Sequence, residues 1–91
     1  MPEISRFFGI IIRIYFELQT QHNRPHFHAY YQGKDIAVAI DNEIEVIAGS
    51  FPKRQERLVL AWAELHRKEL LDNWTLAQIG ERTYPIEPLR K

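Results

Sequence analysis

The sequence contains no cysteine, and this absence removes several kinds of chemistry at once. Without thiols the chain can form no disulfide, use no thiolate nucleophile and hold no cysteine-ligated zinc, so any metal would rest on histidine and carboxylate side chains. Nor does any apolar run reach the roughly 18 residues that a membrane-spanning helix needs. The opening residues "MPEISRFFG" also lack the basic stretch of a secretory signal peptide. We therefore expect a cytoplasmic protein without a membrane partner.

An excess of charge of either sign is also missing, since 12 Lys and Arg balance 12 Asp and Glu. Proteins that hold nucleic acid by bulk electrostatics usually have a basic surface, so the balance gives little support to nucleic-acid binding of this kind. The 91 residues suffice for one small domain, expected over residues 1–91, and leave no room for a separate catalytic lobe. Any site must therefore lie on one small two-layer fold.

Four segments of the first half alternate between apolar and polar side chains with the period of two that is typical of β-strands. Gly33 and Lys34 are expected to form the two-residue turn of a tight hairpin. From Ser50, the expected helix cap, the apolar positions recur with the helical period. The predicted elements are strands at about 9–17, 26–32, 35–41 and 44–48, a helix at about 52–71, an optional short helix at 73–79 that Asp72 or Asn73 would cap, and an extended tail at 81–91.

This pattern predicts an α+β fold in which a four-stranded antiparallel meander is covered on one face by the C-terminal helical segment. Within "HFHAYYQ", alternation would direct Phe27, Ala29 and Tyr31 toward the helix. The opposite face of the sheet would then remain open to solvent or to a partner. The side chains expected on this open face are those of Arg13, Tyr15, Glu17, His26, His28 and Tyr30.

The expected hairpin also predicts which residues face each other across the second and third predicted strands. Counting outward from a turn at Gly33 and Lys34 places His26 opposite Asp41. The open face would therefore combine a His–Asp pair with an arginine and two tyrosines. Its candidate site residues are Arg13, Tyr15, His26, His28, Tyr30 and Asp41.

Three kinds of chemistry could use this face. The two histidines could hold a divalent metal, because residues i and i+2 of a strand lie about 6.6 Å apart, with Asp41, Glu17 or His22 as a third ligand. They could instead act as general base and general acid on a phosphodiester, with Arg13 holding the phosphate, which would be RNA cleavage without a metal. The rings could also stack on bases or form a protein interface without chemistry. The same histidines and tyrosines would also be expected on a solvent-facing strand that has no function beyond the fold.

His66 has a simpler explanation than a functional one. It lies within the apolar stripe of the predicted helix, between Trp62 and Leu70. A histidine in such a stripe is more often a hydrogen-bonded part of the core than a catalytic or ligating group. We therefore expect His66 to be structural, and we predict no cofactor apart from the metal alternative.

Four segments of the chain also carry a family resemblance. They are "ISRFFGIIIRIYF", "RPHFHAYYQGKDIAVAID", "LVLAWAELHRKELL" and "IEPL", and they span nearly the whole sequence. Residues 25–29 form a Pro-His-Phe-His-Ala motif, and residues 62–66 form a Trp-Ala-Glu-Leu-His motif. Together they resemble a small bacterial family described as domain of unknown function 4160. Members often have a second proline where this chain has Arg24, which implies either a less rigid approach to His26 or an added phosphate contact.

The resemblance implies a partner more than an activity, because that family has no established activity. Its members are commonly encoded beside a small protein of another family, domain of unknown function 2442, and the pair resembles a toxin–antitoxin or regulatory module. We accordingly expect a toxin-like component with a small cognate protein as partner and RNA as target. The enzyme hypothesis is a metal-independent endoribonuclease. The alternatives are a non-enzymatic binding module and the metal site, and a homodimer is compatible with each of them.

Overall fold

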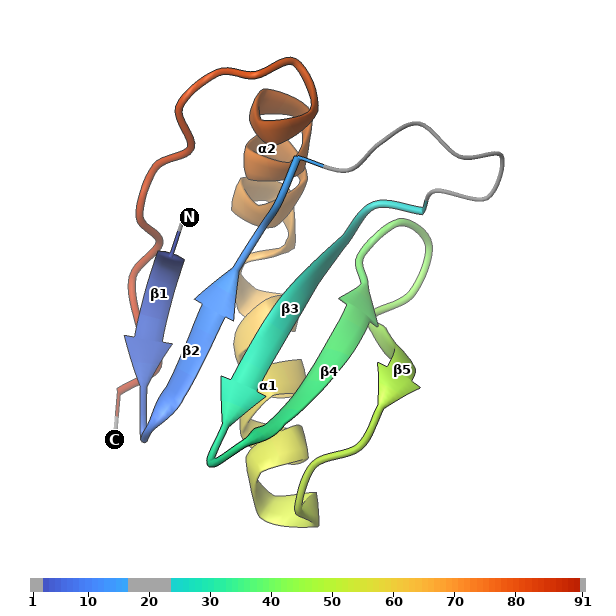
Figure 1. The fold of residues 1–91 in the computed structure, drawn as a ribbon, viewed down its shortest axis with the longest axis vertical. Coiled ribbons are helices and arrows are strands. Elements are labelled where there is room, and N and C mark those ends of the chain that lie inside the picture. The colour runs from blue at the N-terminus through green and yellow to red at the C-terminus, as the bar shows by residue number, and fades with distance from the viewer. Residues whose placement is uncertain (1–2, 17–23, 91) are drawn as a thin grey trace.

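The computed structural model describes residues 3–16 and 24–90, and within these ranges five antiparallel strands form one sheet with two helices on one face (Figure 1). The meander order is the order of the chain. The predicted α+β meander with a helical cover is thus confirmed, with one strand more than expected. The elements are β1 (Glu3–Phe7), β2 (Ile10–Arg13), β3 (His26–Tyr31), β4 (Lys34–Ala39), β5 (Glu45–Gly49), α1 (Lys53–Leu65) and α2 (Arg67–Gln78).

The additional strand arises from a turn that the sequence pattern does not predict. Phe8 and Gly9, between β1 and β2, have φ angles of 50° and 79°. Positive φ at both central residues is what a type I′ hairpin turn requires, and a phenylalanine is rare there because its Cβ disfavours that conformation. The predicted strand at 9–17 is correspondingly shorter in the structure. It pairs only from Ile10 to Arg13, and position 17 lies outside the described residues.

The hairpin between β3 and β4 turns one residue earlier than predicted. Gln32 and Gly33 have φ angles of 46° and 79°, so they are the central residues of this turn. His26 consequently faces Ala39. The predicted facing of His26 and Asp41 is wrong, because moving a turn by one residue shifts every cross-strand pair by two positions.

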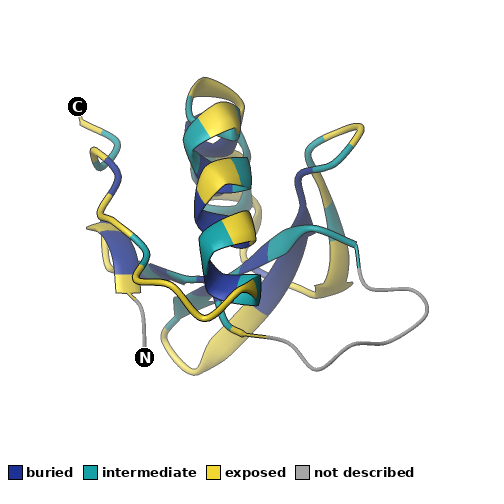
Figure 2. Ribbon diagram, turned by 90° about the horizontal axis from the view of Figure 1, so that it is seen from above, coloured by how far each residue is buried: buried dark blue, intermediate teal, exposed yellow. Residues whose placement is uncertain are grey.

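One hydrophobic core fills the space between the sheet and the helices, and Figure 2 shows the buried residues concentrated there. Trp62 of α1 and Phe27 of β3 are both fully buried, with their rings edge to face at a centroid distance of 5.8 Å. Burying each such aromatic side chain is worth about 2–3 kcal/mol. The core also contains Ile4, Ile10, Ile12, Ile14, Ile36, Val38, Ile40, Val59, Ala63 and Leu70.

The helical region is divided at His66, whereas the sequence predicted one helix at 52–71 with an optional short helix at 73–79. His66 is a turn residue with φ −118° and ψ 24°, and it ends α1 and precedes α2. Ser50 does not cap α1, which begins after Pro52 without a side-chain cap. No helix within the described ranges combines the length and apolar character needed to cross a membrane.

The extended C-terminal tail lies beside the outer edge of β1 (Figure 1). The backbone N–H of Ile86 donates to the carbonyl of Ile4 at 2.7 Å, and Ser5 Oγ donates to the carbonyl of Ile86 at 3.0 Å. Asn73 is fully buried in α2, where its side chain bonds both the carbonyl and the N–H of Tyr84 at 2.9 and 2.8 Å. Asn73, which the sequence pattern suggested as a helix cap, therefore binds the tail and helps to hold it along the outer edge of β1.

Candidate functional site

Rings and hydroxyls from neighbouring strands meet on the face of the sheet that the helices leave open. The strand register places Arg13 of β2 directly opposite His28 of β3, and His28 faces the small Ala37 on its other side. The Tyr15 ring lies 5.1 Å from the His28 ring, and its hydroxyl lies 2.5 Å from the hydroxyl of Tyr30. The predicted assignment of these four polar side chains to one face is confirmed.

His26 joins this group at the end of β3, where the sheet approaches α2. Its ring centroid lies 5.0 Å from that of His28 and 5.0 Å from that of Trp74 in α2. His26 is therefore not turned wholly away from the helices, as alternation alone predicted, because the strand end brings it to the margin of the helical layer. We refer to the five half-buried residues Arg13, Tyr15, His26, His28 and Tyr30 as the open-face cluster.

Arg13 brings a positive charge to the open-face cluster. Its guanidinium carbon lies 5.8 Å from the centre of the Tyr30 ring, which is within the range of a cation–π contact. Its Nε is buried and has no hydrogen-bond partner among the described residues. Buried donors in proteins are normally paired, so this unsatisfied N–H costs stability and argues for a role of the guanidinium group other than stabilising the fold.

Tyr15 and Tyr30 form a hydrogen-bonded pair through their hydroxyl groups. Burial first, and then the hydrogen bond with Tyr15, raises the pKa of Tyr30 well above its usual range. The Tyr30 hydroxyl therefore keeps its proton at neutral pH. Either hydroxyl can donate to the other, and the one that accepts can direct its own proton toward a ligand.

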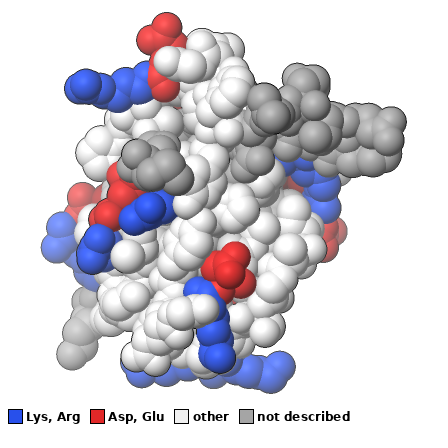
Figure 3. Space-filling view, in the orientation of Figure 1, with Lys and Arg blue, Asp and Glu red and all other residues white. Residues whose placement is uncertain are grey.

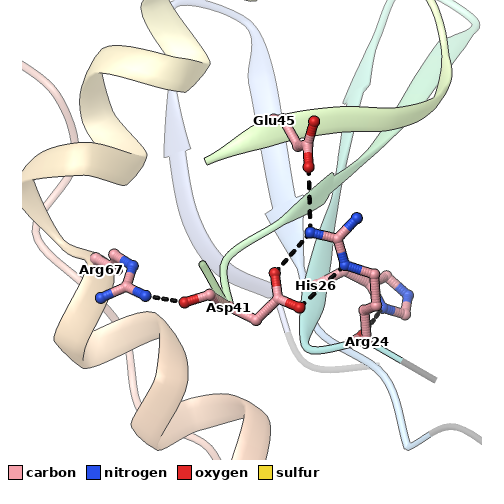
Figure 4. Close-up of polar contacts among 5 residues, drawn as sticks. All are labelled: Arg24, His26, Asp41, Glu45 and Arg67. Atoms are coloured by element: carbon pink, nitrogen blue, oxygen red, sulfur yellow. Dashed lines mark hydrogen bonds and ion pairs between the residues drawn. The ribbon is translucent and has the colours of Figure 1, made fainter. Parts of the chain in front are cut away.

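Asp41, a predicted site residue, lies outside the open-face cluster. Its Oδ2 and Oδ1 accept hydrogen bonds from Nε and Nη2 of Arg24 at 3.0 and 2.7 Å, and the same Nη2 lies 3.2 Å from Glu45 (Figure 4). The Arg24 guanidinium holds the pKa of Asp41 well below its usual range. Arg67 of α2 donates to the backbone carbonyl of Asp41. Arg24, which the sequence linked to a phosphate contact, is thus bound to carboxylates.

One of the three predicted metal ligands is already paired with an arginine. The predicted set was His26, His28 and Asp41, but an arginine holds the carboxylate of Asp41. Across residues 3–16 and 24–90, the histidine, aspartate and glutamate side chains form no group of three or more that could hold a metal ion. The other predicted third ligands, Glu17 and His22, lie outside the described residues.

His66 is a partly buried residue of the helix junction. Its Nδ1 lies 2.5 Å from a carboxylate oxygen of Glu69, and its ring centroid lies 5.5 Å from that of Trp62. Only 18% of its side chain is exposed, so the imidazole is packed and paired within the helical layer. This position agrees with the structural role expected from the sequence.

Two residues of α2 support the open-face cluster without having been predicted to do so. Gln78 donates from Nε2 to the backbone carbonyl of Tyr15 at 2.9 Å, and Trp74 packs against His26. The two residues are four positions apart and therefore share one face of the helix. That spacing is a signal in the sequence, but it does not tell which part of the sheet the helix face meets.

The fold and the open-face cluster define a small α+β protein with an arginine, two histidines and two tyrosines on the uncovered face of a meander sheet. Residues 9–75 match the family described as Domain of unknown function (DUF4160). The match covers more than half of the chain, so the chain belongs to this family, and it includes all five cluster residues. No curated protein and no solved structure matches the chain significantly.

Proposed function

We propose that the chain is the toxin-like component of a cytoplasmic bacterial two-protein module and that its open-face cluster cleaves RNA without a metal. The observation that carries the proposal is the meeting of two imidazoles, a tyrosine pair and an arginine on one face of the sheet. Metal-independent cleavage of RNA needs a base, an acid and a donor to the phosphate. The cognate partner rests on the family resemblance.

The proposed reaction divides the proton transfers between the two histidines. One imidazole accepts the proton of a ribose 2′-hydroxyl as the 2′-oxygen forms a bond to the adjacent phosphorus. The bond from phosphorus to the 5′-oxygen breaks, and this oxygen takes a proton from the other, protonated imidazole. The products are a 2′,3′-cyclic phosphate and a 5′-hydroxyl. The 5.0 Å between the centroids of His26 and His28 lets both rings reach one phosphodiester.

The remaining cluster residues have supporting roles in this reaction. Arg13 donates to the non-bridging oxygens, where negative charge accumulates as the 2′-oxygen attacks. Tyr15 and Tyr30 orient the attacking hydroxyl through the proton that their mutual hydrogen bond leaves available. The need for a 2′-hydroxyl makes RNA, and not DNA, the substrate.

Cleavage of a labelled RNA in the presence of EDTA tests the proposal. The wild type should cleave the RNA but not a DNA of the same sequence, and His26→Ala or His28→Ala should each lower the rate by about 100-fold or more. His66→Gln is the matched control, since it removes a histidine outside the cluster and should leave the rate unchanged. In cells, expression should inhibit growth, and co-expression of the neighbouring gene product should relieve the inhibition. Equal rates in wild type and the double mutant would remove the histidines from the mechanism.

A protein-binding face without catalysis is the second candidate function, and the character of the surface favours it. Figure 3, which shows the open side of the sheet, has uncharged side chains over most of this face. Neither of two clefts, of 640 and 450 Å³, is lined by a cluster residue. An aromatic surface with few charges is typical of the core of a protein–protein interface. In this case His28→Ala and Tyr30→Ala should weaken binding of the neighbouring gene product, and RNA should stay intact.

A further inference from the structure

Charged side chains from four segments converge on Arg24 and Asp41 near the start of β3 (Figure 4). We call Arg24, Asp41, Glu45 and Arg67 the ion-pair frame, and these residues lie before β3, after β4, in β5 and in α2. The Arg24 and Asp41 side chains are 37% and 27% exposed, so their contact is partly shielded and not merely a loose surface pair. Two parallel hydrogen bonds between arginine and carboxylate also fix the orientation of both groups. The start of β3 is therefore held in place from several sides.

The frame fixes the backbone carbonyl that His26 contacts. Nδ1 of His26 lies 2.6 Å from the carbonyl oxygen of Arg24. Arg24 precedes Pro25, and a residue before proline is restricted to extended backbone conformations. Ile40 also donates its backbone N–H to the carbonyl of Pro25 at 3.0 Å. The Arg24 side chain is anchored on Asp41 while its carbonyl orients the imidazole.

This contact determines where the proton of the imidazole lies. A carbonyl oxygen can only accept a hydrogen bond, so Nδ1 of His26 must carry the hydrogen. This is true of the neutral ring and of the charged ring alike. Nε2 is then the atom at which the ring gains or loses a proton. The Trp74 ring, 5.0 Å away, packs on the imidazole and opposes the ring flip that would exchange the two nitrogens.

We propose that the Arg24–Asp41 pair positions His26 so that Nδ1 keeps its proton and the imidazole exchanges protons with a substrate only through Nε2. Arg24 and Asp41 are positioning residues, because they act through His26. In the cleavage reaction, the lone pair on Nε2 accepts the 2′-hydroxyl proton or, in the protonated ring, Nε2 gives its proton to the leaving 5′-oxygen. This catalytic consequence rests on the proposed function, whereas the position of the proton does not.

Nitrogen-15 NMR of the imidazoles, in alkaline buffer and without substrate, tests the position of the proton. The His26 signals are assigned by their loss in His26→Gln. In the wild type Nδ1 should be protonated and Nε2 should not, which is the reverse of the form that histidine side chains favour in water. In Asp41→Asn the Nε2-protonated form should increase severalfold. Glu87→Gln, which removes a carboxylate bound to Arg90 in the tail, is the matched control and should match the wild type.

Two results in these spectra would overturn the proposal. The first is a wild-type His26 that carries its proton on Nε2, and this result stands even if the variant does not fold. The second is an Asp41→Asn protein whose His26 signals equal those of the wild type.

Kinetics then separate this inference from the proposed function. With an RNA that the wild type cleaves, Asp41→Asn should lower kcat by about tenfold or more, because a misplaced catalytic group loses its geometry. KM should change little, since Arg13 is retained, and Asp41→Glu should restore part of kcat. An unchanged kcat and pH–rate profile in Asp41→Asn would remove the positioning role. A wild type that cleaves no RNA would refute the proposed function alone, and the spectra would still decide the proton position.

Discussion

Replacement of Arg13 by methionine should show whether Arg13 serves the stability of the fold or the cleavage of RNA. The buried Nε of Arg13 has no partner among the described residues, and an unsatisfied buried donor costs about 1–3 kcal/mol. Methionine removes that cost and fills a similar volume, while the lost cation–π contact with Tyr30 costs about 0.5–2 kcal/mol. The free energy of unfolding of Arg13→Met should therefore stay equal to the wild-type value or rise by about 1 kcal/mol.

The same substitution should strongly reduce RNA cleavage. Removing one preorganised donor to a developing charge costs about 100-fold or more in kcat. Arg6→Met is the matched control, because Arg6 lies on the adjacent β1, is 59% exposed and is paired only with Glu3 among the contacts that the structure records for it. It loses the same charge but should change neither property appreciably. Urea unfolding and the RNA assay measure the two effects on the same preparations.

The opposite pattern would refute the reasoning about Arg13. If Arg13→Met lowers the free energy of unfolding by more than about 1 kcal/mol and leaves the cleavage rate unchanged, Arg13 is a structural residue. Functional sites are expected to contain residues that add nothing to stability but have a large effect on activity.

Three further predictions concern the framework around the cluster. Asn73→Ala should lower the free energy of unfolding by about 2 kcal/mol in urea, because two hydrogen bonds to the tail are lost. The pKa of Asp41 is lower in the folded state than in the unfolded state, so its stabilising effect is complete above the unfolded pKa of about 3.9 and is lost as pH falls toward the folded pKa. The stability difference between wild type and Asp41→Asn, measured in urea at several pH values, should accordingly be constant near neutrality and shrink in acid. Gly49→Ala should destabilise by more than about 2 kcal/mol, since a Cβ would lie 2.2 Å from the carbonyl oxygen of Asp35, whereas Gly33→Ala, with a similar φ but open space, should cost only about 1 kcal/mol in the same assay.

The periodicity of the side chains predicts most of this fold, and the turns account for the errors. The alternation from Ile10 to Arg13 correctly predicts which side chains of β2 face the core, because burying one face of a strand requires a period of two. The turns at Phe8–Gly9 and Gln32–Gly33 both place a residue other than glycine at positive φ. Asparagine and aspartate are the usual signals for that conformation, and neither is present at these positions. One strand was missed and one register was shifted for this reason.

The candidate site was predictable where it depends on a single strand and unpredictable where it depends on packing between elements. Arg13, His28 and Tyr30 share a face because alternation within β2 and β3 requires it. Asp41 was misplaced because its position depends on the turn. The contact between Trp74 and His26 depends on how α2 lies across the sheet, and helical periodicity identifies a buried face without identifying the residues that it meets.

The chemical nature of the RNA ends tests the central claim most directly. An RNA that wild-type protein has cleaved in EDTA should carry 2′,3′-cyclic phosphates and 5′-hydroxyls by mass spectrometry. An RNA with a single 2′-deoxy nucleotide at the cleaved position should stay intact there, and His26→Ala with His28→Ala should produce no such ends. Cleavage that leaves 3′-hydroxyls, that tolerates the 2′-deoxy nucleotide, or that persists in the double mutant would contradict acid–base catalysis by the open-face cluster.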